Sequence, residues 1–370
     1  MATVSLRNIY KNYDSKRGKV EAVKDLNLDI QDKEIMSLLG PSGCGKTSTL
    51  RMIAGIEKIS KGQLYIDNTL ANDLTPAQRN ISLAFEDYAL YFHLTVRENL
   101  SLCLEAKKLQ EDVIQNKIKK VSEMLGIEDI LNVKTTALSG GQQQRVSLAR
   151  ALVRDPSIFL LDEPISHIET EKRYKILAEI KKINREFGST MLYVTHNQTE
   201  AVAVSKKIAI MNFAELQQVG TRDEIYNNPI NLFVANFVGE PPINIMKCKI
   251  ASERDVIQLQ AENSTLTFIP EEKTAKLLHE LHLNEVVLGL RPQNIHIKKL
   301  SNTQKSMKGI TQVKEFLGED INLILKNGDH NFSVFCTTDM GFDKGQELEL
   351  YYDPYRLHLF HPETEKAIRA

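Results

Sequence analysis

Hydrophobic and polar positions follow one pattern up to about residue 238 and a different pattern after it. In the first part, short apolar runs such as 34–39 and 157–161 alternate with segments whose apolar residues recur at helical spacing, such as 112–125. Buried strands that alternate with amphipathic helices are typical of a mostly parallel sheet with helices on both faces. We therefore predict an α/β domain over residues 1–238.

The elements expected in this domain follow from local signals. Apolar runs and alternation predict strands over residues 4–9, 20–30, 34–39, 62–66, 81–85, 157–161 and 190–194. Helices are predicted over residues 49–54, from residue 95, and over 112–125, 139–152 and 176–187. Thr95 and Ser139 are favourable N-cap residues. The helices between residues 87 and 152 are expected to form a helical subdomain.

The pattern changes where Gly239-Glu240-Pro241-Pro242 interrupts the chain. A series of short alternating segments follows, among them residues 286–290, 332–336 and 348–352. Regular short strands separated by turns are typical of a small β-barrel or sandwich. Residues 239–370 are therefore predicted to form a separate, β-rich domain.

Length and composition narrow the classes of function. A chain of 370 residues is too long for one core and favours two domains. Its 47 Lys and Arg residues nearly balance 48 Asp and Glu residues, and the net charge of −1 argues against a nucleic-acid partner. The four cysteines form no C-x-x-C pair, so no zinc site is indicated, and free thiols fit a reducing cytoplasm. No signal peptide or membrane-spanning apolar run is visible, so any work at a membrane is expected to depend on a partner.

The most informative stretch lies directly after the predicted strand 34–39. It fits the phosphate-loop pattern G-x-x-x-x-G-K-[ST], in which backbone N–H groups surround a phosphate and the next helix points its N-terminus at it. The lysine would neutralise the β- and γ-phosphates, and the threonine hydroxyl would ligate Mg²⁺. The strand before it and the helix after it argue against an ordinary glycine-rich turn. The predicted ATP-binding residues of this loop are Gly40, Pro41, Ser42, Gly43, Cys44, Gly45, Lys46, Thr47 and Ser48.

Two acidic residues, Asp162 and Glu163, follow the predicted strand 157–161. Such a pair alone is a common surface feature, but beside a phosphate loop in an α/β chain it indicates a Walker B element. Asp162 would then help to hold Mg²⁺. Glu163, which points the other way, would polarise the attacking water as a general base.

A second candidate anion site lies at residues 138–145, which read Leu-Ser-Gly-Gly-Gln-Gln-Gln-Arg. A serine and two glycines that open a helix can bind an anion with backbone N–H groups. Within one chain this site would be redundant, because the phosphate loop already binds the triphosphate. It would not be redundant if it binds the nucleotide of a second subunit. The alternative, an ordinary helix N-cap, is disfavoured by two adjacent glycines.

Tyr13, at the end of a predicted strand, is a candidate surface for adenine stacking. Without the phosphate loop, the preferred interpretation would be a half-exposed tyrosine at a sheet edge.

These motifs, in this order, resemble those of the ATP-binding-cassette (ABC) ATPases, and the resemblance covers about residues 3–240. The second half of the chain narrows it further. Residues 239–244, 288–293, 316–319 and 352–360 resemble the OB-like C-terminal regulatory domain of the maltose-importer type of ATPase. Members of that type energise bacterial uptake of oligosaccharides and related solutes.

The resemblance implies a role for each matching residue. Tyr13 would stack on adenine, and His196 would contact the γ-phosphate in its own subunit and sense its loss. The ATP held by the partner subunit would be contacted by Ser139, Gly140, Gly141 and Gln142. Residues 88–94, with the apolar pair Tyr91 and Phe92, would line the groove where a membrane subunit inserts a coupling helix. Ordinary packing between subdomains is the alternative for that pair.

Three features depart from the family pattern. Glu86 stands where the family has a glutamine that contacts Mg²⁺ and the attacking water; a carboxylate can still ligate Mg²⁺ but adds a negative charge beside the γ-phosphate. His167 and Glu169 change the loop after Asp162 and Glu163, and Phe92 replaces a proline in the docking segment. The predicted catalytic residues remain Glu163, His196 and Glu86. The predicted Mg²⁺ ligands are Thr47, Glu86 and Asp162.

The resulting prediction is the ATPase subunit of a bacterial importer for oligosaccharides or related sugars, with ATP and Mg²⁺ as cofactors. It would act at the cytoplasmic face of the membrane, as a homodimer or with a similar ATPase, beneath two permease subunits and with a separate extracytoplasmic solute-binding protein. Importers of glycerol-phosphate, polyamines, iron or sulfate fit the same layout. A soluble ABC protein acting on ribosomes or DNA is disfavoured by the single cassette and the β-rich tail. A catalytically weakened regulatory subunit is supported only by Glu86 and Glu169.

Overall fold

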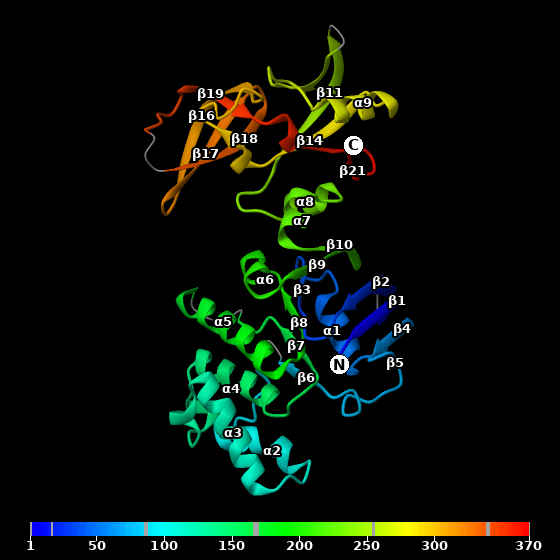
Figure 1. The fold of residues 1–370 in the computed structure, drawn as a ribbon, viewed down its shortest axis with the longest axis vertical. Coiled ribbons are helices and arrows are strands. Elements are labelled where there is room, and N and C mark those ends of the chain that lie inside the picture. Colours follow the sequence, from blue (N-terminus) through cyan, green and yellow to red (C-terminus); the bar gives the residue numbers. More distant parts are fainter. Residues whose placement is uncertain are drawn as a thin grey trace. The chain divides into compact units, whose positions relative to one another are not determined.

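The computed structural model describes residues 2–15, 18–84, 88–165, 170–253, 256–337 and 341–369. They form two compact units, Met1–Arg222 and Asp223–Ala370 (Figure 1). Each unit has a hydrophobic core of its own. The boundary that the sequence pattern suggests, at residue 238, falls inside the second unit, because Ala235 packs in a cluster with Val287 and Phe360.

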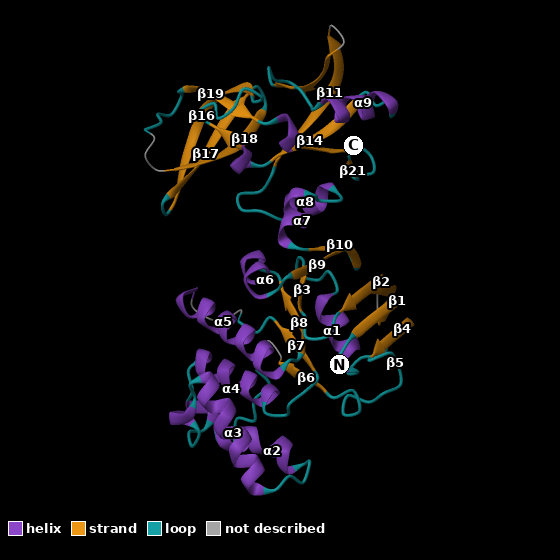
Figure 2. Cartoon of the chain, viewed as in Figure 1, coloured by secondary structure: helices purple, strands orange, loops and turns teal. Residues whose placement is uncertain are grey.

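Strands and helices alternate in the first unit (Figure 2). Its described strands are β1 (Val4–Ser15), β2 (Gly18–Ile30), β3 (Ile35–Leu39), β4 (Lys61–Ile66), β5 (Thr69–Leu70), β6 (Ile81–Ala84), β7 (Ile158–Asp162), β8 (Thr190–Thr195), β9 (Lys207–Asn212) and β10 (Glu215–Gly220). Its described helices are α1 (Lys46–Ala54), α2 (Val96–Glu105), α3 (Glu111–Leu125), α4 (Gly140–Leu152), α5 (Thr170–Phe187) and α6 (Gln198–Val204), with short 3-10 turns at Glu128–Ile130 and Thr135–Ala137. The sequence signals predict most of these elements, but not β5, β9, β10 or α6.

A sheet with the strand order β10-β9-β3-β8-β7-β6 forms the centre of the first unit. All neighbouring strands pair in parallel except β9 and β10, so the expected mostly parallel sheet is confirmed. Alternate residues of its strands face different cores. Leu160 and Leu192 pack with α1 and the antiparallel sheet β2-β1-β4-β5, whereas Phe159 and Met191 pack with α4 and α5. Continuous apolar strands are what a sheet covered on both faces requires.

Helices α2, α3 and α4 gather at one end of the first unit and form the expected helical subdomain (Figure 1). Thr95 and Ser139 are the N-caps of α2 and α4, and each forms a capping box, with Glu98 and Gln142 respectively. A capping box satisfies two backbone N–H groups that the helix itself leaves unpaired, and a cap contributes about 1 kcal/mol. Local sequence alone therefore fixes where these two helices begin.

The second unit is β-rich, as predicted. It begins with α7 (Arg222–Asn227) and α8 (Leu232–Phe237). One sheet has the order β13-β12-β11-β14-β20-β21 and another the order β15-β19-β16-β17-β18. The strands are β11 (Asn244–Glu253), β12 (Val256–Ala261), β13 (Thr267–Phe268), β14 (Glu285–Leu290), β15 (Ile295–His296), β16 (Lys305–Leu317), β17 (Asp320–Asn327), β18 (His330–Thr337), β19 (Glu347–Tyr352), β20 (Leu357–Phe360) and β21 (Ala367–Ile368). Helix α9 (Glu272–Glu280) and 3-10 turns at Pro292–Asn294 and Pro354–Arg356 complete the described elements.

A buried arginine joins the helical start of the second unit to its sheets. Arg291 follows β14 and is 0% exposed. Its guanidinium donates to the backbone oxygens of Tyr226, Ala235 and Val238. Val238 is the C-cap of α8, so the cation also faces the negative end of that helix. Burial lowers the pKa of Arg291 to about 10, and the group stays charged at neutral pH.

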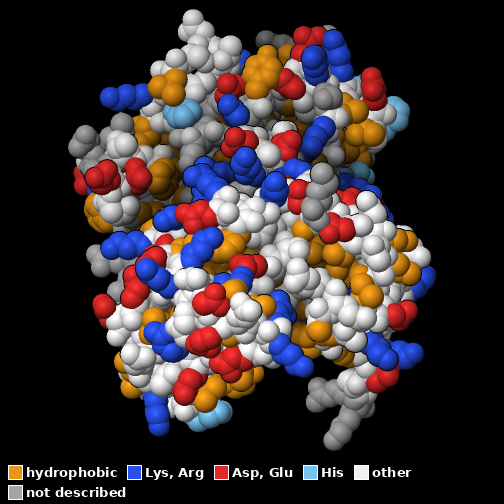
Figure 3. Space-filling view, turned by 60° about the horizontal axis from the view of Figure 1, so that its bottom comes forward, with side chains coloured by type: hydrophobic (Ala, Val, Ile, Leu, Met, Phe, Trp, Pro, Cys, Tyr) orange, Lys and Arg blue, Asp and Glu red, His pale blue; other side chains and the backbone are white. Residues whose placement is uncertain are grey.

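The molecular surface reflects the near balance of charges. Acidic and basic side chains are interspersed over much of the face shown in Figure 3, with small groups of hydrophobic side chains between them. Among the described residues, no helix is both long enough and apolar enough to cross a membrane.

Candidate functional site

The ends of three neighbouring strands bring together the phosphate loop, the acidic pair after β7 and His196. Strand β8 lies between β3 and β7, and the register pairs Leu39 with Thr195 and Asp162 with Val194. The phosphate loop follows β3, Asp162 ends β7 and His196 follows β8, so all three segments leave the sheet at its carboxyl edge. Open α/β sheets bind their ligands at this edge.

Lys46 lies inside the phosphate loop, residues 40–48. It is the first residue of α1 and is 5% exposed. Its ammonium donates to the backbone oxygens of Gly40, at 2.8 Å, and Pro41, at 2.9 Å. Among the described residues no carboxylate pairs with it, and a buried cation without a counter-charge is costly. A phosphate group would supply that counter-charge.

Two glycines of this loop are required by neighbouring backbone. A Cβ at Gly40 would lie 2.3 Å from the oxygen of Met211, and a Cβ at Gly45 would lie 2.2 Å from the oxygen of Ala22. Gly45 also has a φ of +106°, where side chains are strained. The loop is therefore enclosed by β2 and by β9, a strand that the sequence signals do not predict.

Thr47 and Asp162 form the corner that would hold a metal ion. The hydroxyl of Thr47 donates to Oδ1 of Asp162 at 3.3 Å, and Asp162 is 6% exposed. A hydroxyl and a carboxylate this close can share one coordination sphere, and oxygen donors suit Mg²⁺. The remaining predicted ligand, Glu86, lies outside the described residues, as do His167 and Glu169.

Glu163 and His196 contact each other directly. Nδ1 of His196 lies 2.9 Å from Oε2 of Glu163, and the two side chains are 54% and 18% exposed. With the carboxylate ionised, Nδ1–H is the donor and orients it. Glu163 has a φ of +45°, and its N–H donates to the oxygen of Val194 at 3.0 Å. Backbone strain of this kind is concentrated at functional sites.

The Tyr13 hydroxyl contacts helix α1, which follows the phosphate loop, and the turn after that helix. Its hydroxyl donates to Glu57 and lies 3.2 Å from Oγ of Ser48. Glu57 also pairs with Lys11 at 3.1 Å and with Arg51 at 3.6 Å. Burial and the bond to Glu57 raise the pKa of Tyr13. Burial alone would raise the pKa of Glu57 as well, but the hydrogen bonds from Tyr13 and Lys11 outweigh it and the pKa is lowered.

The signature segment, Ser139 to Gln142, lies at the start of α4. Ser139 and Gly140 are exposed, and the Ser139 side chain accepts from the backbone N–H of Gln142. A Cβ at Gly141 would meet nothing within 4 Å, and one at Gly140 would meet only the Tyr88 hydroxyl at 4.0 Å. No hydrogen bond or ion pair between described residues joins this segment to the phosphate loop. Asp162, Glu163 and His196 thus share the carboxyl edge of the sheet with the phosphate loop, whereas this set lies at the start of α4.

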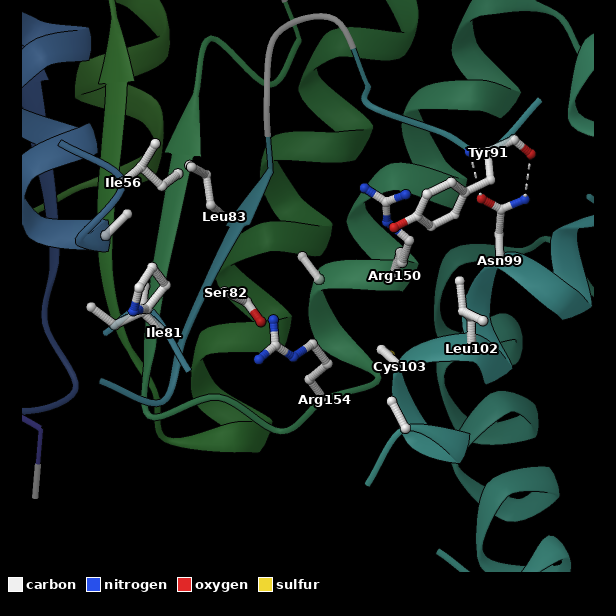
Figure 4. A pocket seen from close by; sticks show the side chains of 14 residues that line it. Ile56, Ile81, Ser82, Leu83, Tyr91, Asn99, Leu102, Cys103, Arg150 and Arg154 are labelled. Atoms are coloured by element: carbon white, nitrogen blue, oxygen red, sulfur yellow. Dashed lines mark hydrogen bonds between the residues drawn. The ribbon is translucent and has the colours of Figure 1, made fainter. Parts of the chain in front are cut away.

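A groove of about 420 Å³ lies between the sheet and the helical subdomain (Figure 4). Ile81 and Leu83 line one side, and Tyr91, Leu102 and Arg150 line the other. The Arg150 guanidinium lies 5.1 Å from the centre of the Tyr91 ring, in cation–π contact. Burial lowers the pKa of Arg150. The groove thus combines an apolar surface with two arginines, Arg150 and Arg154, both of them partly buried.

In the predicted docking segment 88–94, the buried side chain of Asn99 hydrogen-bonds the backbone of Tyr91. Asn99, which is 0% exposed, accepts from the N–H of Tyr91 at 2.9 Å and donates to the oxygens of Tyr91 and Thr95. The side chains of Tyr91 and Phe92 nevertheless remain 45% and 52% exposed. Rigid backbone with exposed aromatic side chains is typical of a docking surface.

Several residues that build the site carry no motif. Glu57 fixes Tyr13, and Asn99 fixes Tyr91, through contacts that the sequence does not announce. Glu200 is partly signalled, because Asn197-x-x-Glu200 fits a helix N-cap with an acidic third residue. Its actual side-chain partners could not be inferred from that pattern.

The chain is similar to known proteins along its whole length. The sequence profile of the family described as "ABC transporter" matches residues 23–166. The chain is 39% identical over 373 residues to the "Oligosaccharides import ATP-binding protein MsmX" of Bacillus subtilis. It is 38% identical over 380 residues to the "Trehalose/maltose import ATP-binding protein MalK" of Thermococcus litoralis. Both matches cover 100% of each chain.

A solved structure, "Dimeric structure of a post-hydrolysis state of the ATP-binding cassette MJ0796 bound to ADP and Pi", matches with a TM-score of 0.55 and 33% identity. The match covers 59% of this chain and 98% of the other, so it comprises the cassette without the β-rich unit. The family profile and the full-length relatives therefore indicate the same family. The chain belongs to the ABC transporter family, as an ATP-binding and ATP-hydrolysing subunit.

Proposed function

We propose that the protein energises an importer of oligosaccharides or related sugars by hydrolysing ATP. The observation that carries the proposal is the cluster at the carboxyl edge of the sheet. It comprises Lys46, Thr47, Asp162, Glu163 and His196. It offers a buried cation for phosphate, two oxygen donors for a divalent cation and a carboxylate paired with a histidine. Phosphoryl transfer from ATP to water requires this combination of groups.

Each group has a defined role in this proposal. Lys46 binds oxygens of the β- and γ-phosphates, and the N–H groups at the start of α1 surround them. Thr47 and Asp162 would hold Mg²⁺, whose charge would offset that of the phosphate oxygens. Glu163 accepts a proton from the attacking water, and His196 orients that carboxylate and contacts the γ-phosphate. The products are ADP and inorganic phosphate.

The signature segment serves a second subunit in this proposal. Its glycines face open space, and nothing in the described part of the same chain requires them. Two copies arranged head to tail would each bring Ser139, Gly140 and Gly141 to the ATP on the partner's phosphate loop. A related cassette has been solved as a dimer with ADP and phosphate, which supports this arrangement. ATP binding would close such a dimer, and hydrolysis would reopen it.

The cargo and the membrane partners follow from the named relatives. MsmX and MalK are named as import ATP-binding proteins for oligosaccharides and for trehalose and maltose, and both match this chain along its whole length. We assign this chain the same class of cargo, two permease subunits and a separate solute-binding protein. The groove beside Tyr91 and Arg150 would receive a helix of a permease at the cytoplasmic face of the membrane.

ATP turnover by the purified full-length chain tests the enzymatic part. Wild-type protein should release phosphate from Mg-ATP and should be stabilised by nucleotide in a thermal-shift assay. Lys46→Ala removes the fixed charge on the β- and γ-phosphates and should abolish both. An unchanged nucleotide-dependent shift in this variant would contradict the assignment of the loop.

Uptake by whole cells tests the cargo. A strain that lacks this protein should lose uptake of labelled maltose and longer maltosaccharides, and wild-type protein should restore it. Glu163→Gln should not restore it. Normal sugar uptake together with loss of glycerol-phosphate, polyamine, iron or sulfate uptake would overturn the sugar assignment and leave the ATPase assignment intact.

A further inference from the structure

A buried carboxylate, that of Glu200, binds the hydroxyl of Thr195, the residue directly before His196. Glu200 is the third residue of α6 and is 4% exposed. Its Oε2 accepts from the hydroxyl of Tyr193 at 3.0 Å and from that of Thr195 at 2.8 Å. Its Oε1 lies 3.5 Å from a guanidinium nitrogen of Arg173 on α5. Both carboxylate oxygens are therefore satisfied by partners from different elements.

The start of α6 departs from the usual capping box. The side chain of Asn197 caps the helix by accepting from the N–H of Glu200 at 3.1 Å. In a capping box the glutamate would return to the N–H of the cap residue. Here the N–H of Asn197 donates instead to Oγ1 of Thr195 at 3.0 Å, and that same hydroxyl donates to Glu200. The carboxylate thus holds the Thr195 hydroxyl, and that hydroxyl in turn holds the N–H of Asn197, so both neighbours of His196 are linked to Glu200.

Helix capping alone does not explain this arrangement. A capping box at the surface would satisfy the same N–H groups without burying a charge. Burial of an ionised carboxylate is costly unless its partners are well placed. The contacts that offset this cost all lead to β8, which delivers His196, and to α5. Glu200 therefore stabilises one backbone conformation of residues 195–197.

We propose that Glu200 is a positioning residue for His196, an inference that rests on the ATP hydrolysis proposed above. By fixing Thr195 and Asn197, it keeps Nδ1 of His196 at the carboxylate of Glu163, where the histidine orients the general base. Glu200 touches neither the phosphate loop nor the metal-binding corner through any hydrogen bond or ion pair between described residues. Its loss should therefore slow hydrolysis and leave ATP binding nearly unchanged.

A matched pair of hydroxyl deletions separates positioning from general stability. Tyr193→Phe and Thr195→Val each remove one buried hydroxyl that donates to Oε2 of Glu200. Only Thr195 also holds the N–H of Asn197. We expect Thr195→Val and Glu200→Gln to lower kcat about tenfold with less than a twofold change in ATP affinity, and Tyr193→Phe to lower kcat clearly less.

Two further measurements keep the test independent of folding. In single-turnover assays, Glu200→Gln should have little additional effect in a His196→Ala background, because the residue it positions is gone. The imidazole NMR signals of His196 should shift in Glu200→Gln and Thr195→Val, but not in Ser205→Ala, which loses a hydroxyl bond at the other end of α6.

The positioning role would be overturned if Tyr193→Phe and Thr195→Val lowered kcat equally. It would also be overturned if Glu200→Gln slowed single turnover as much in the His196→Ala background as in the wild type. Both outcomes require a wild-type protein that hydrolyses ATP. A wild-type protein without turnover would instead contradict the proposed function itself.

Discussion

The two glycine-rich segments of the first unit are built in opposite ways. In the phosphate loop, a Cβ at Gly45 would lie 2.2 Å from the oxygen of Ala22, and Lys46 is enclosed by carbonyl oxygens of the same loop. In the signature segment, a Cβ at Gly141 would meet nothing within 4 Å, and Ser139 is exposed. The first segment needs its glycines in order to fold, whereas among the described residues nothing requires the glycines of the second.

This difference distinguishes a site that one chain completes from a site that it leaves open. Glycine within a helix costs about 0.5–1 kcal/mol relative to alanine. The first turn of α4 contains two such residues, Gly140 and Gly141, without a close neighbour that excludes a methyl group. This loss of helix stability is explained if another molecule approaches the backbone at Gly140 and Gly141 so closely that a side chain would not fit. We therefore expect substitutions in the two segments to separate stability from turnover.

The largest effect is expected from Gly45→Ala. The new Cβ would meet backbone rather than a movable side chain, at a φ of +106°, so we expect a loss of roughly 3 kcal/mol or more in stability and loss of ATP binding. Gly43→Ala is the matched control, because its φ is +80° but nothing lies within 4 Å. Urea denaturation and nucleotide-dependent thermal shift measure both effects. Equal stability of the two variants would show that the approach to β2 does not constrain the loop.

Glu163→Gln should have the next largest effect, and it acts on turnover alone. The amide keeps the shape of the side chain but cannot act as a general base, so turnover should fall by about 10²-fold or more. ATP should still bind, and because hydrolysis no longer reopens the dimer, size-exclusion chromatography should show an ATP-dependent dimer. Hydrolysis at the wild-type rate would mean that another group, such as Glu86, accepts the proton.

Gly141→Ala tests the open segment. Since a methyl group meets nothing there, stability should stay the same or rise by about 0.5–1 kcal/mol, while turnover falls about tenfold because the methyl group would crowd the partner's ATP. ATP affinity of the monomer should not change. Thermal denaturation and phosphate release, measured on the same sample, check the two halves of this expectation. A destabilised variant would mean that the chain needs this glycine itself, and full turnover would mean that the segment serves no nucleotide.

The sequence predicts the parts of this site that depend on local pattern. The phosphate loop, the acidic pair 162–163 and the caps Thr95 and Ser139 are each read from a few consecutive residues, and the structure contains the local elements that each predicts. Contacts between distant segments could not be predicted in the same way. The hydrogen bond between Tyr13 and Glu57 depends on how β1 lies against the turn after α1.

The start of the second unit illustrates the same limit. The proline pair at 241–242 is the strongest local break in the sequence, and it suggests a boundary near residue 238. The structure instead groups residues 223–238 with the second unit, because the guanidinium of Arg291 binds three backbone oxygens there. Nothing in the local sequence around residue 230 announces an arginine some 60 residues later as its partner.

The smallest effect is expected at Glu57, which ties the adenine side of the site to the phosphate-loop helix. Glu57→Gln removes the charge that pairs with Lys11 and weakens the bond from the Tyr13 hydroxyl, so Tyr13 should lose part of its fixed orientation. A net loss of about 1 kcal/mol for one such bond corresponds to a rise of roughly fivefold in the Kd for ATP. Tyr13→Phe, which keeps the ring but removes the hydroxyl, should have a similar effect.

If Glu57 acts through Tyr13, the double variant should bind ATP no more weakly than the worse single variant. The pKa of Glu57 is lowered below 4.5, so the carboxylate stays ionised and its stabilising effect is lost only as the pH falls through that lowered value. The affinity difference between wild type and Glu57→Gln should therefore stay constant from about pH 5.5 to 8. Isothermal titration with ATP across this range provides the measurement. A difference that disappears within this range, or effects of Glu57→Gln and Tyr13→Phe that add in full, would mean that Glu57 does not hold the tyrosine in place.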